Sequence, residues 1–82
     1  MAVKAQDITA ATNHANVQNL RGWSVRGSSL IWRLRVLDGS GQILASVNGD
    51  DHQLYPDIID AETGTFFEVV SGTLTEGVLY FT

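Results

Sequence analysis

The residues that could bind a metal ion are two histidines and a group of aspartates. His14 and His52 are the only histidines, and the chain has no cysteine. A zinc site would need both histidines together with carboxylates, and the segment around His14 contains no acid. We therefore expect no zinc site and interpret His52 as a strand residue on a solvated face.

The aspartates at positions 50, 51, 57 and 60 raise the question of calcium, which takes about six to eight oxygen ligands from such loops. Their spacing lacks the D-x-D-x-D-G pattern and the downstream glutamate of an EF-hand. We interpret them as a solvated, acid-rich turn around Asn48 and Gly49, and we predict no metal and no cofactor.

Catalytic and ligand-binding patterns are similarly sparse. The serines are not set in a G-x-S-x-G elbow, and a domain this small seldom forms the cleft that paired carboxylates need. We expect no enzyme and no catalytic residue. A sugar-binding face could be lined by four aromatic residues, Trp23, Trp32, Tyr55 and Tyr80. We interpret Trp23 and Trp32 instead as core anchors on neighbouring strands. Tyr55, beside Pro56, is the best candidate for an exposed aromatic residue.

The length of the chain and the distribution of its charges limit the classes of function that it can have. A chain of 82 residues makes one domain with a modest core. The first 35 residues contain all five basic residues and one acid, whereas the remaining 47 contain eight acids and no Lys or Arg. Either Arg-bearing and acid-bearing strands pair across a sheet, or opposite faces of opposite sign steer a partner. The sequence lacks the cluster of Lys and Arg with interleaved aromatic residues that would indicate nucleic-acid binding. It also lacks the apolar run that would indicate a leader or a membrane span, so we expect neither.

The elements that would position these residues are β-strands. Short strands are predicted where apolar residues recur between clusters of Gly, Ser, Asn and Asp. These strands are residues 17–26, 30–37, 42–47 and 52–55. In residues 30–37 the alternation predicts Leu30, Trp32, Leu34 and Val36 in the core, with Arg33 and Arg35 on the other face. Ile43, Ala45 and Val47 are predicted to share one face, and Pro56 to end an edge strand.

The two ends of the chain complete this pattern. Residues 64–82 are predicted to form two strands joined by a short turn, and Ser71-Gly72 and Glu76-Gly77 supply the turn residues. Residues 1–16 are either a flexible arm or an edge strand, and residues 17–82 form the domain proper. We expect the domain to fold without the arm. The sequence therefore predicts an all-β fold, a compact antiparallel β-sandwich of six to seven short strands.

Four segments taken together resemble small virion proteins of tailed bacteriophages. They are LRGWSVR at 20–26, LRVLDGSGQILA at 34–45, LYPD at 54–57 and GTFFEVVSGT at 64–73. The resemblance covers residues 17–82. The chain departs from it at Phe67, where Val or Tyr is usual, and by an extra residue in 74–76.

The resemblance implies a structural virion protein made in the host cytoplasm, without catalytic residues. It implies a capsid decoration or cement protein that stabilises the assembled head, with the major capsid protein or other virion proteins as partners. A homo-oligomer is expected, and a trimer is favoured. The alternative is a tail- or fibre-associated module that recognises a receptor or carbohydrate. The candidate interface residues are Val3, Lys4, Gln6, Ile8 and Tyr55.

Overall fold

The chain folds into one antiparallel sheet of six strands. This computed structural model describes residues 2–8, 12–38, 40 and 42–82. The strands are β1 (Lys4–Asp7), β2 (Thr12–His14), β3 (Asn19–Val36), β4 (Ile43–Asn48), β5 (Asp51–Asp60) and β6 (Thr65–Phe81). Every pairing between them is antiparallel. The predicted all-β, antiparallel class is confirmed, and the described residues contain no helix that could cross a membrane.

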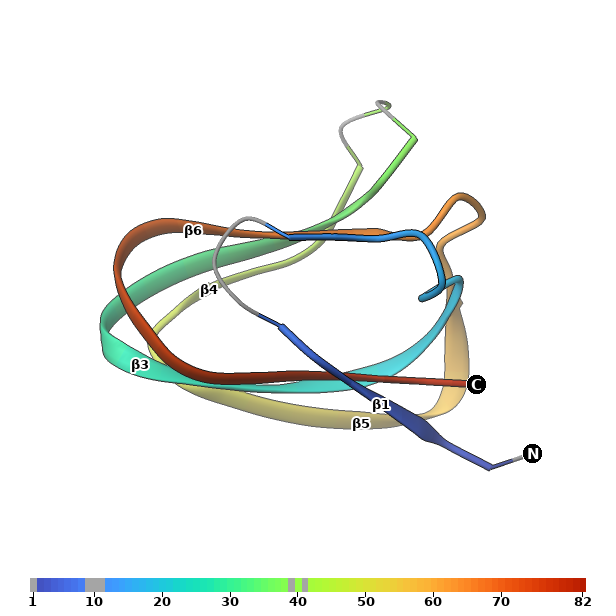
Figure 1. The fold of residues 1–82 in the computed structure, drawn as a ribbon, viewed down its shortest axis with the longest axis horizontal. Coiled ribbons are helices and arrows are strands. Elements are labelled where there is room, and N and C mark those ends of the chain that lie inside the picture. The colour runs from blue at the N-terminus through green and yellow to red at the C-terminus, as the bar shows by residue number, and fades with distance from the viewer. Residues whose placement is uncertain (1, 9–11, 39, 41) are drawn as a thin grey trace.

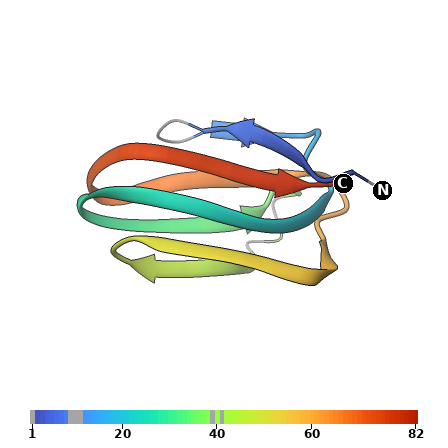
Figure 2. The same ribbon diagram turned by 90° about the horizontal axis from the view of Figure 1, so that it is seen from below.

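Two long strands form the spine of this sheet. β3 has 18 residues and β6 has 17, and they pair from Leu20–Phe81 at one end to Val36–Thr65 at the other. The paired strands bend back on themselves, so that their two halves face each other (Figure 1). β1 and β5 flank one half of the spine, whereas β2 and β4 flank the other. One edge of the folded sheet therefore consists of β1 and β2, and the opposite edge of β4 and β5 (Figure 2).

The bend depends on small residues that lie against each other in the two long strands. Ser29 and Gly72 both have left-handed backbone angles, with φ of 51° and 85°, and a methyl group on Gly72 would collide with the carbonyl oxygen of Ser29. Gly27 approaches the backbone of Thr73 equally closely. The register between β3 and β6 shifts several times around this point, and such irregularities increase the local bend of a strand pair.

The bend corrects two predictions about strand ends. Residues 27–29 do not stop a strand, because β3 continues through them. The predicted hairpin in residues 64–82 is wrong, because the two halves of β6 pair with β3 and not with each other. Both segments carry the Gly and Ser residues that normally mark turns. Here they allow a paired ribbon to fold over, which makes the two central strands long instead of short.

The core lies between the two halves of the sheet. The alternation predicted for residues 30–37 is confirmed: Leu30, Trp32, Leu34 and Val36 are buried, whereas Arg33 points outward. Trp23 and Trp32 are core residues, as predicted, but both belong to β3 and meet edge to face with ring centroids 6.0 Å apart. Fully burying side chains of this kind stabilises a fold by roughly 1.5–3 kcal/mol each. The remaining members of the core cluster are Ile8, Val17, Leu20, Val25, Phe67, Leu79 and Phe81.

Each tryptophan also ties the core to the β4–β5 turn. The Trp32 indole N–H donates to the carbonyl oxygen of Gly49 at 3.0 Å, and the Trp23 indole N–H donates to Asp51 Oδ2 at 2.8 Å. A buried indole N–H needs such a partner. The two bonds fix the β4–β5 turn beside the bend of the spine.

The N-terminal residues form an edge strand in this structure. β1 pairs with residues 78–81 of β6, and the backbone N–H of Ile8 donates to Gly77 at 3.0 Å. The Ile8 side chain lies over Gly77 and is 5% exposed. Ile8 therefore belongs to the core together with residues from Val17 onward, and the edge-strand alternative for the N-terminal residues is the one that the structure shows.

Candidate functional site

The most prominent surface feature is a bulge in the outer strand β5. Leu20 and Gly22 of β3 pair with Ile59 and Leu54, so Arg21 alone faces residues 55–58 of β5. Pro56 lies within this bulge, where its missing N–H breaks no ladder bond. The prediction that Pro56 marks an edge strand is confirmed, but the strand continues to Asp60 instead of ending there. We call residues 54–58 the β5 protrusion.

The β5 protrusion exposes large apolar side chains. Leu54 is 58% exposed, Ile58 is 50% and Tyr55 is 37%. Two contacts hold the protrusion in place: Arg21 Nε donates to the carbonyl oxygen of Tyr55 at 3.0 Å, and the Tyr55 ring meets buried Trp23 edge to face at 5.6 Å. A fixed apolar projection of this kind is characteristic of protein contact surfaces.

The acidic residues of this region divide into two pairs. Asp50 accepts a hydrogen bond from the backbone N–H of Gly27 at 3.0 Å, and Asp51 accepts from Trp23 and from Gln53. These two carboxylates hold the β4–β5 turn. Asp57 and Asp60 instead lie exposed along β5, and within the described ranges no basic side chain comes within 4 Å of either.

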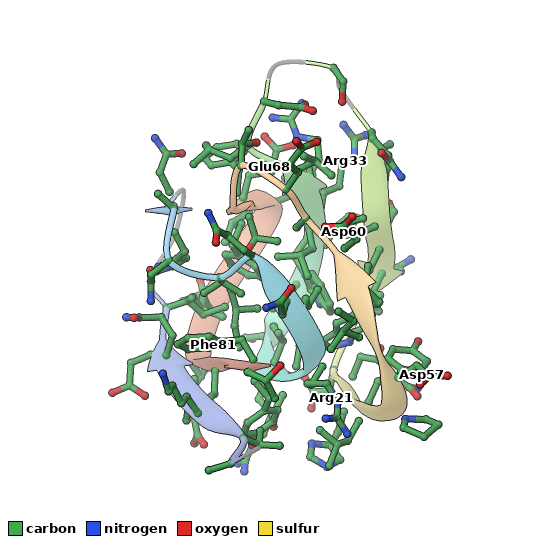
Figure 3. All side chains as sticks on the ribbon, turned by 90° about the vertical axis from the view of Figure 1, so that its right-hand side faces the viewer. Arg21, Arg33, Asp57, Asp60, Glu68 and Phe81 are labelled. Atoms are coloured by element: carbon green, nitrogen blue, oxygen red, sulfur yellow. The ribbon has the colours of Figure 1, made fainter. Side chains whose placement is uncertain are left out.

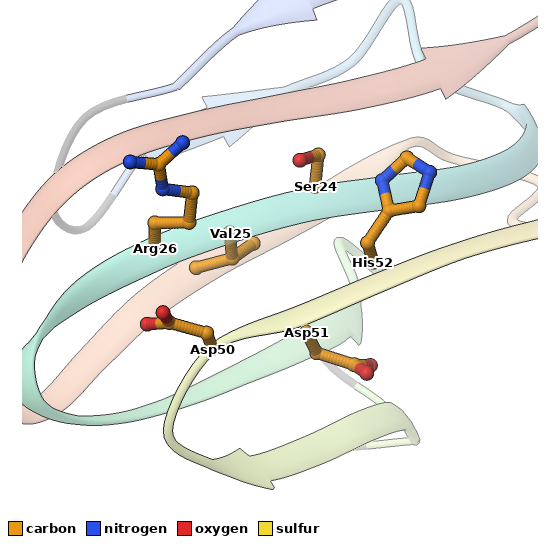
Figure 4. Close-up of a pocket in the computed structure, with 6 residues that line it drawn as sticks. All are labelled: Ser24, Val25, Arg26, Asp50, Asp51 and His52. Carbon is orange, nitrogen blue, oxygen red and sulfur yellow. The ribbon is translucent and has the colours of Figure 1, made fainter.

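A shallow depression of about 320 Å³ lies beside the turn. Figure 4 shows its lining residues Ser24, Val25, Arg26, Asp50, Asp51 and His52. Successive strand residues point to opposite faces: Asp51 bonds to buried Trp23, whereas the His52 ring meets Tyr80 at 6.3 Å. Asp51 and His52 therefore do not form an acid–base pair. Across residues 2–8, 12–38, 40 and 42–82, no three His, Asp or Glu side chains are grouped to hold a metal ion.

A basic and apolar surface occupies the outer side of the other sheet half. Arg35 and Arg33 share the carboxylate of Glu68, at 3.3 and 4.0 Å, and the Arg35 guanidinium lies 5.1 Å from the centroid of the Phe66 ring. This is the cross-strand pairing that the first interpretation of the charge pattern predicts. Because two guanidinium groups share one carboxylate, the cluster keeps an excess positive charge.

Exposed apolar residues surround this cluster. Ile43 is 52% exposed and Val70 is 48%. The shared face predicted for Ile43, Ala45 and Val47 is wrong at Ile43, because a register shift opposite Leu34 and Arg35 turns it away while the other two pack against the core. We call the surface formed by Arg33, Arg35, Ile43, Phe66, Glu68 and Val70 the arginine face.

The interface residues proposed from the sequence do not form one site. Val3 is 44% exposed next to β1, and Lys4 and Gln6 lie on β1 itself. Tyr55 lies on β5, at the opposite edge of the sheet (Figure 2). Ile8 lies in the core instead of on the surface. The sequence analysis did not identify Leu54 and Ile58 as candidate contact residues. The available signal was their position two residues before and two residues after Pro56, which marks an edge strand.

Two ionisable groups have pKa values that differ from their ordinary range. Burial lowers the pKa of His14, which is 6% exposed and whose Nε2 atom has no hydrogen-bond partner among the described atoms. Hydrogen bonds from the Ser40 side chain and backbone lower the pKa of Asp38. Neither group lies in the β5 protrusion or the arginine face.

Comparisons with protein-family models, with curated proteins and with solved structures give no significant match to this chain.

Proposed function

We propose that this chain is a structural virion protein of a tailed bacteriophage, a decoration or cement subunit that binds the assembled head. The order of its segments resembles such proteins, and an all-β domain with open sheet edges suits that role. Its partners would be the major capsid protein or other virion proteins, together with further copies of itself.

One observation carries this proposal: large apolar side chains are exposed at both edges of the folded sheet. Val3 is exposed next to β1, and Leu54, Tyr55 and Ile58 are exposed on β5. Small soluble domains tend to blunt such edges, whereas a subunit of an assembly uses them for contacts. We assign the edge formed by Val3, Lys4 and Gln6 to the contact with the head lattice.

The mechanism would be thermodynamic. A protein that binds the assembled lattice and not its separate subunits stabilises the lattice by mass action. Many copies multiply a small free energy at each site. Such a role needs a rigid domain with well-placed contact surfaces, and the core between the two sheet halves provides that rigidity.

The alternative function is a tail- or fibre-associated module that binds a receptor or a carbohydrate. Tyr55 favours it, because an aromatic ring that is 37% exposed and fixed against Trp23 could stack on a sugar. In that case Tyr55→Ala would abolish binding to host cells and leave head stability unchanged.

Quantitative mass spectrometry of virions purified from the encoding phage separates the two functions. We expect on the order of hundreds of copies per particle, as the symmetry of a head lattice requires. A few copies up to a few tens would favour the tail, and absence from the virion would exclude both functions.

The assigned lattice edge can be tested by sedimentation with heads that lack this chain. Val3→Asp combined with Lys4→Glu should weaken binding at least about tenfold. Thr75→Asp, on an exposed position of β6 away from β1 and the arginine face, provides a matched control and should bind as the unaltered protein does. Equal binding of all three proteins would exclude this edge as the lattice contact.

A further inference from the structure

We propose that copies of this chain associate head to tail, with the β5 protrusion of one copy seated on the arginine face of the next. The inference rests on the proposed function and deepens it, because it names the occupant of the protrusion and the surface that receives it. It leaves the β1 edge available for the head lattice.

The β5 protrusion is built for contact through side chains. A partner strand cannot continue the sheet past this point, because four residues bulge opposite Arg21 and Pro56 has no N–H to donate. What the protrusion offers instead is Leu54, Tyr55 and Ile58, at least 37% exposed, beside the carboxylates of Asp57 and Asp60. Its occupant must therefore be apolar with an excess of positive charge.

The arginine face of the same chain has that chemistry. Arg33 is 44% exposed and its distance to Glu68 is 4.0 Å, at the outer limit of an ion pair. The closer partner of Glu68 is Arg35, at 3.3 Å. The Arg33 guanidinium can therefore pair with a second carboxylate, while Ile43 and Val70 supply the apolar contacts around it. Complementary charge would set the register, and the apolar side chains would supply most of the affinity.

The positions of the two surfaces favour a contact between different copies. Figure 3 places Asp57 on the bulge of the edge strand β5, whereas Arg33 and Glu68 lie at the other sheet half. One copy cannot bring them together. A two-fold contact of protrusion with protrusion would place acids against acids, which is unfavourable. A contact between two different surfaces gives a head-to-tail arrangement, which either closes into a ring or extends as a filament.

Charge reversal in the purified protein tests this arrangement. Sedimentation velocity should show that the unaltered protein associates as its concentration increases, and that Asp57→Arg and Arg33→Asp each weaken association at least about tenfold. The double variant, with both changes in one chain, should associate again, because its basic protrusion now meets an acidic face. Asp7→Arg, an exposed acid on β1, is the matched control and should associate normally.

Several results of this experiment would contradict the head-to-tail arrangement. A protein that stays monomeric at millimolar concentration, or single variants that associate normally, would overturn the proposal. So would a folded double variant that stays monomeric. Circular dichroism of each variant checks folding, and Arg33→Gln replaces Arg33→Asp if the latter unfolds. Because no virion is needed, this test can fail while the virion copy number supports the proposed function, and the reverse also holds.

Discussion

At the scale of single residues, His14 combines burial with an unused ring nitrogen. It lies on β2, where it pairs with Thr65 of β6, and it is 6% exposed. Burial lowers the pKa of the ring and so favours its neutral form, and Nε2 has no partner among the described atoms. A buried polar atom without a partner costs free energy, and a charged ring at that place would cost more.

Acidification should therefore weaken the fold through His14. Because its folded pKa lies below the ordinary value of 6.5, the unfolded chain binds more protons than the folded chain as the pH falls past 6.5. The stabilisation linked to the neutral His14 ring should therefore be complete above pH 6.5, and the free energy of unfolding should decrease as the pH falls below that value. Urea denaturation between about pH 7.5 and pH 5.5 measures this slope, above the range in which carboxylates titrate.

The variant His14→Asn should flatten the slope, whereas His52→Asn on the exposed face should retain it. An unchanged slope in His14→Asn would show that other groups cause the pH dependence. The sequence indicated the residue but not its burial, because the segment around His14 has little apolar periodicity. His14 pairs with Thr65 of β6, which lies some fifty positions further along the chain, and local periodicity carries no information about such a pairing.

At the scale of the elements, the sequence predicts which face of a strand is buried better than it predicts where the strand ends. Alternation in residues 30–37 placed Leu30 and Trp32 correctly, since the period of a strand is a local property. The residue types around Gly27 and Gly72 predict strand ends, whereas both glycines lie inside strands. The same residue types permit a turn or a bend. Which one forms depends on the pairing of β3 with β6, which is a long-range contact.

The bend can be tested with two glycines that share a left-handed backbone. Gly72 has a φ of 85° and lies against Ser29, whereas Gly49 has a φ of 105° and open space where a Cβ would lie. Alanine at either position carries backbone strain, which costs more than about 1 kcal/mol. Gly72→Ala should also collide with the backbone of β3 and lose clearly more stability than Gly49→Ala. Chemical denaturation of both variants measures the difference, and equal losses would show that the bend tolerates a side chain.

The N-terminal strand provides a second test at this scale. Ile8 is buried in the core, whereas Val3 is 44% exposed. Ile8→Ala should cost about 2–5 kcal/mol, as is usual for truncating a core side chain, and Val3→Ala should change stability by less than about 0.5 kcal/mol. Thermal denaturation compares the two. If both variants melt like the unaltered protein, β1 is a dispensable arm, as the sequence alone suggested.

At the scale of the whole molecule, the uneven charge of the sequence becomes two separate surfaces. Both interpretations of that charge pattern have a counterpart: Arg33 and Arg35 pair with Glu68 across the sheet, while Asp57 and Asp60 remain exposed on β5. The sequence indicated Tyr55 as an exposed aromatic residue. It could not place Tyr55 at the edge opposite Val3, because strand order depends on which strands pair, and alternation carries no information about pairing.

Head-to-tail association predicts that thermal stability depends on protein concentration. Association of folded copies draws the unfolding equilibrium toward the folded state by mass action. The melting temperature of the unaltered protein should therefore rise across a hundredfold increase in concentration, and added salt should reduce the rise because it screens Arg33 from Asp57. The melting temperature of the Asp57→Arg variant should rise clearly less over the same range, while Asp7→Arg should behave as the unaltered protein does. Differential scanning calorimetry provides the measurement. A melting temperature of the unaltered protein that is independent of concentration would mean that the β5 protrusion and the arginine face do not hold copies together in solution.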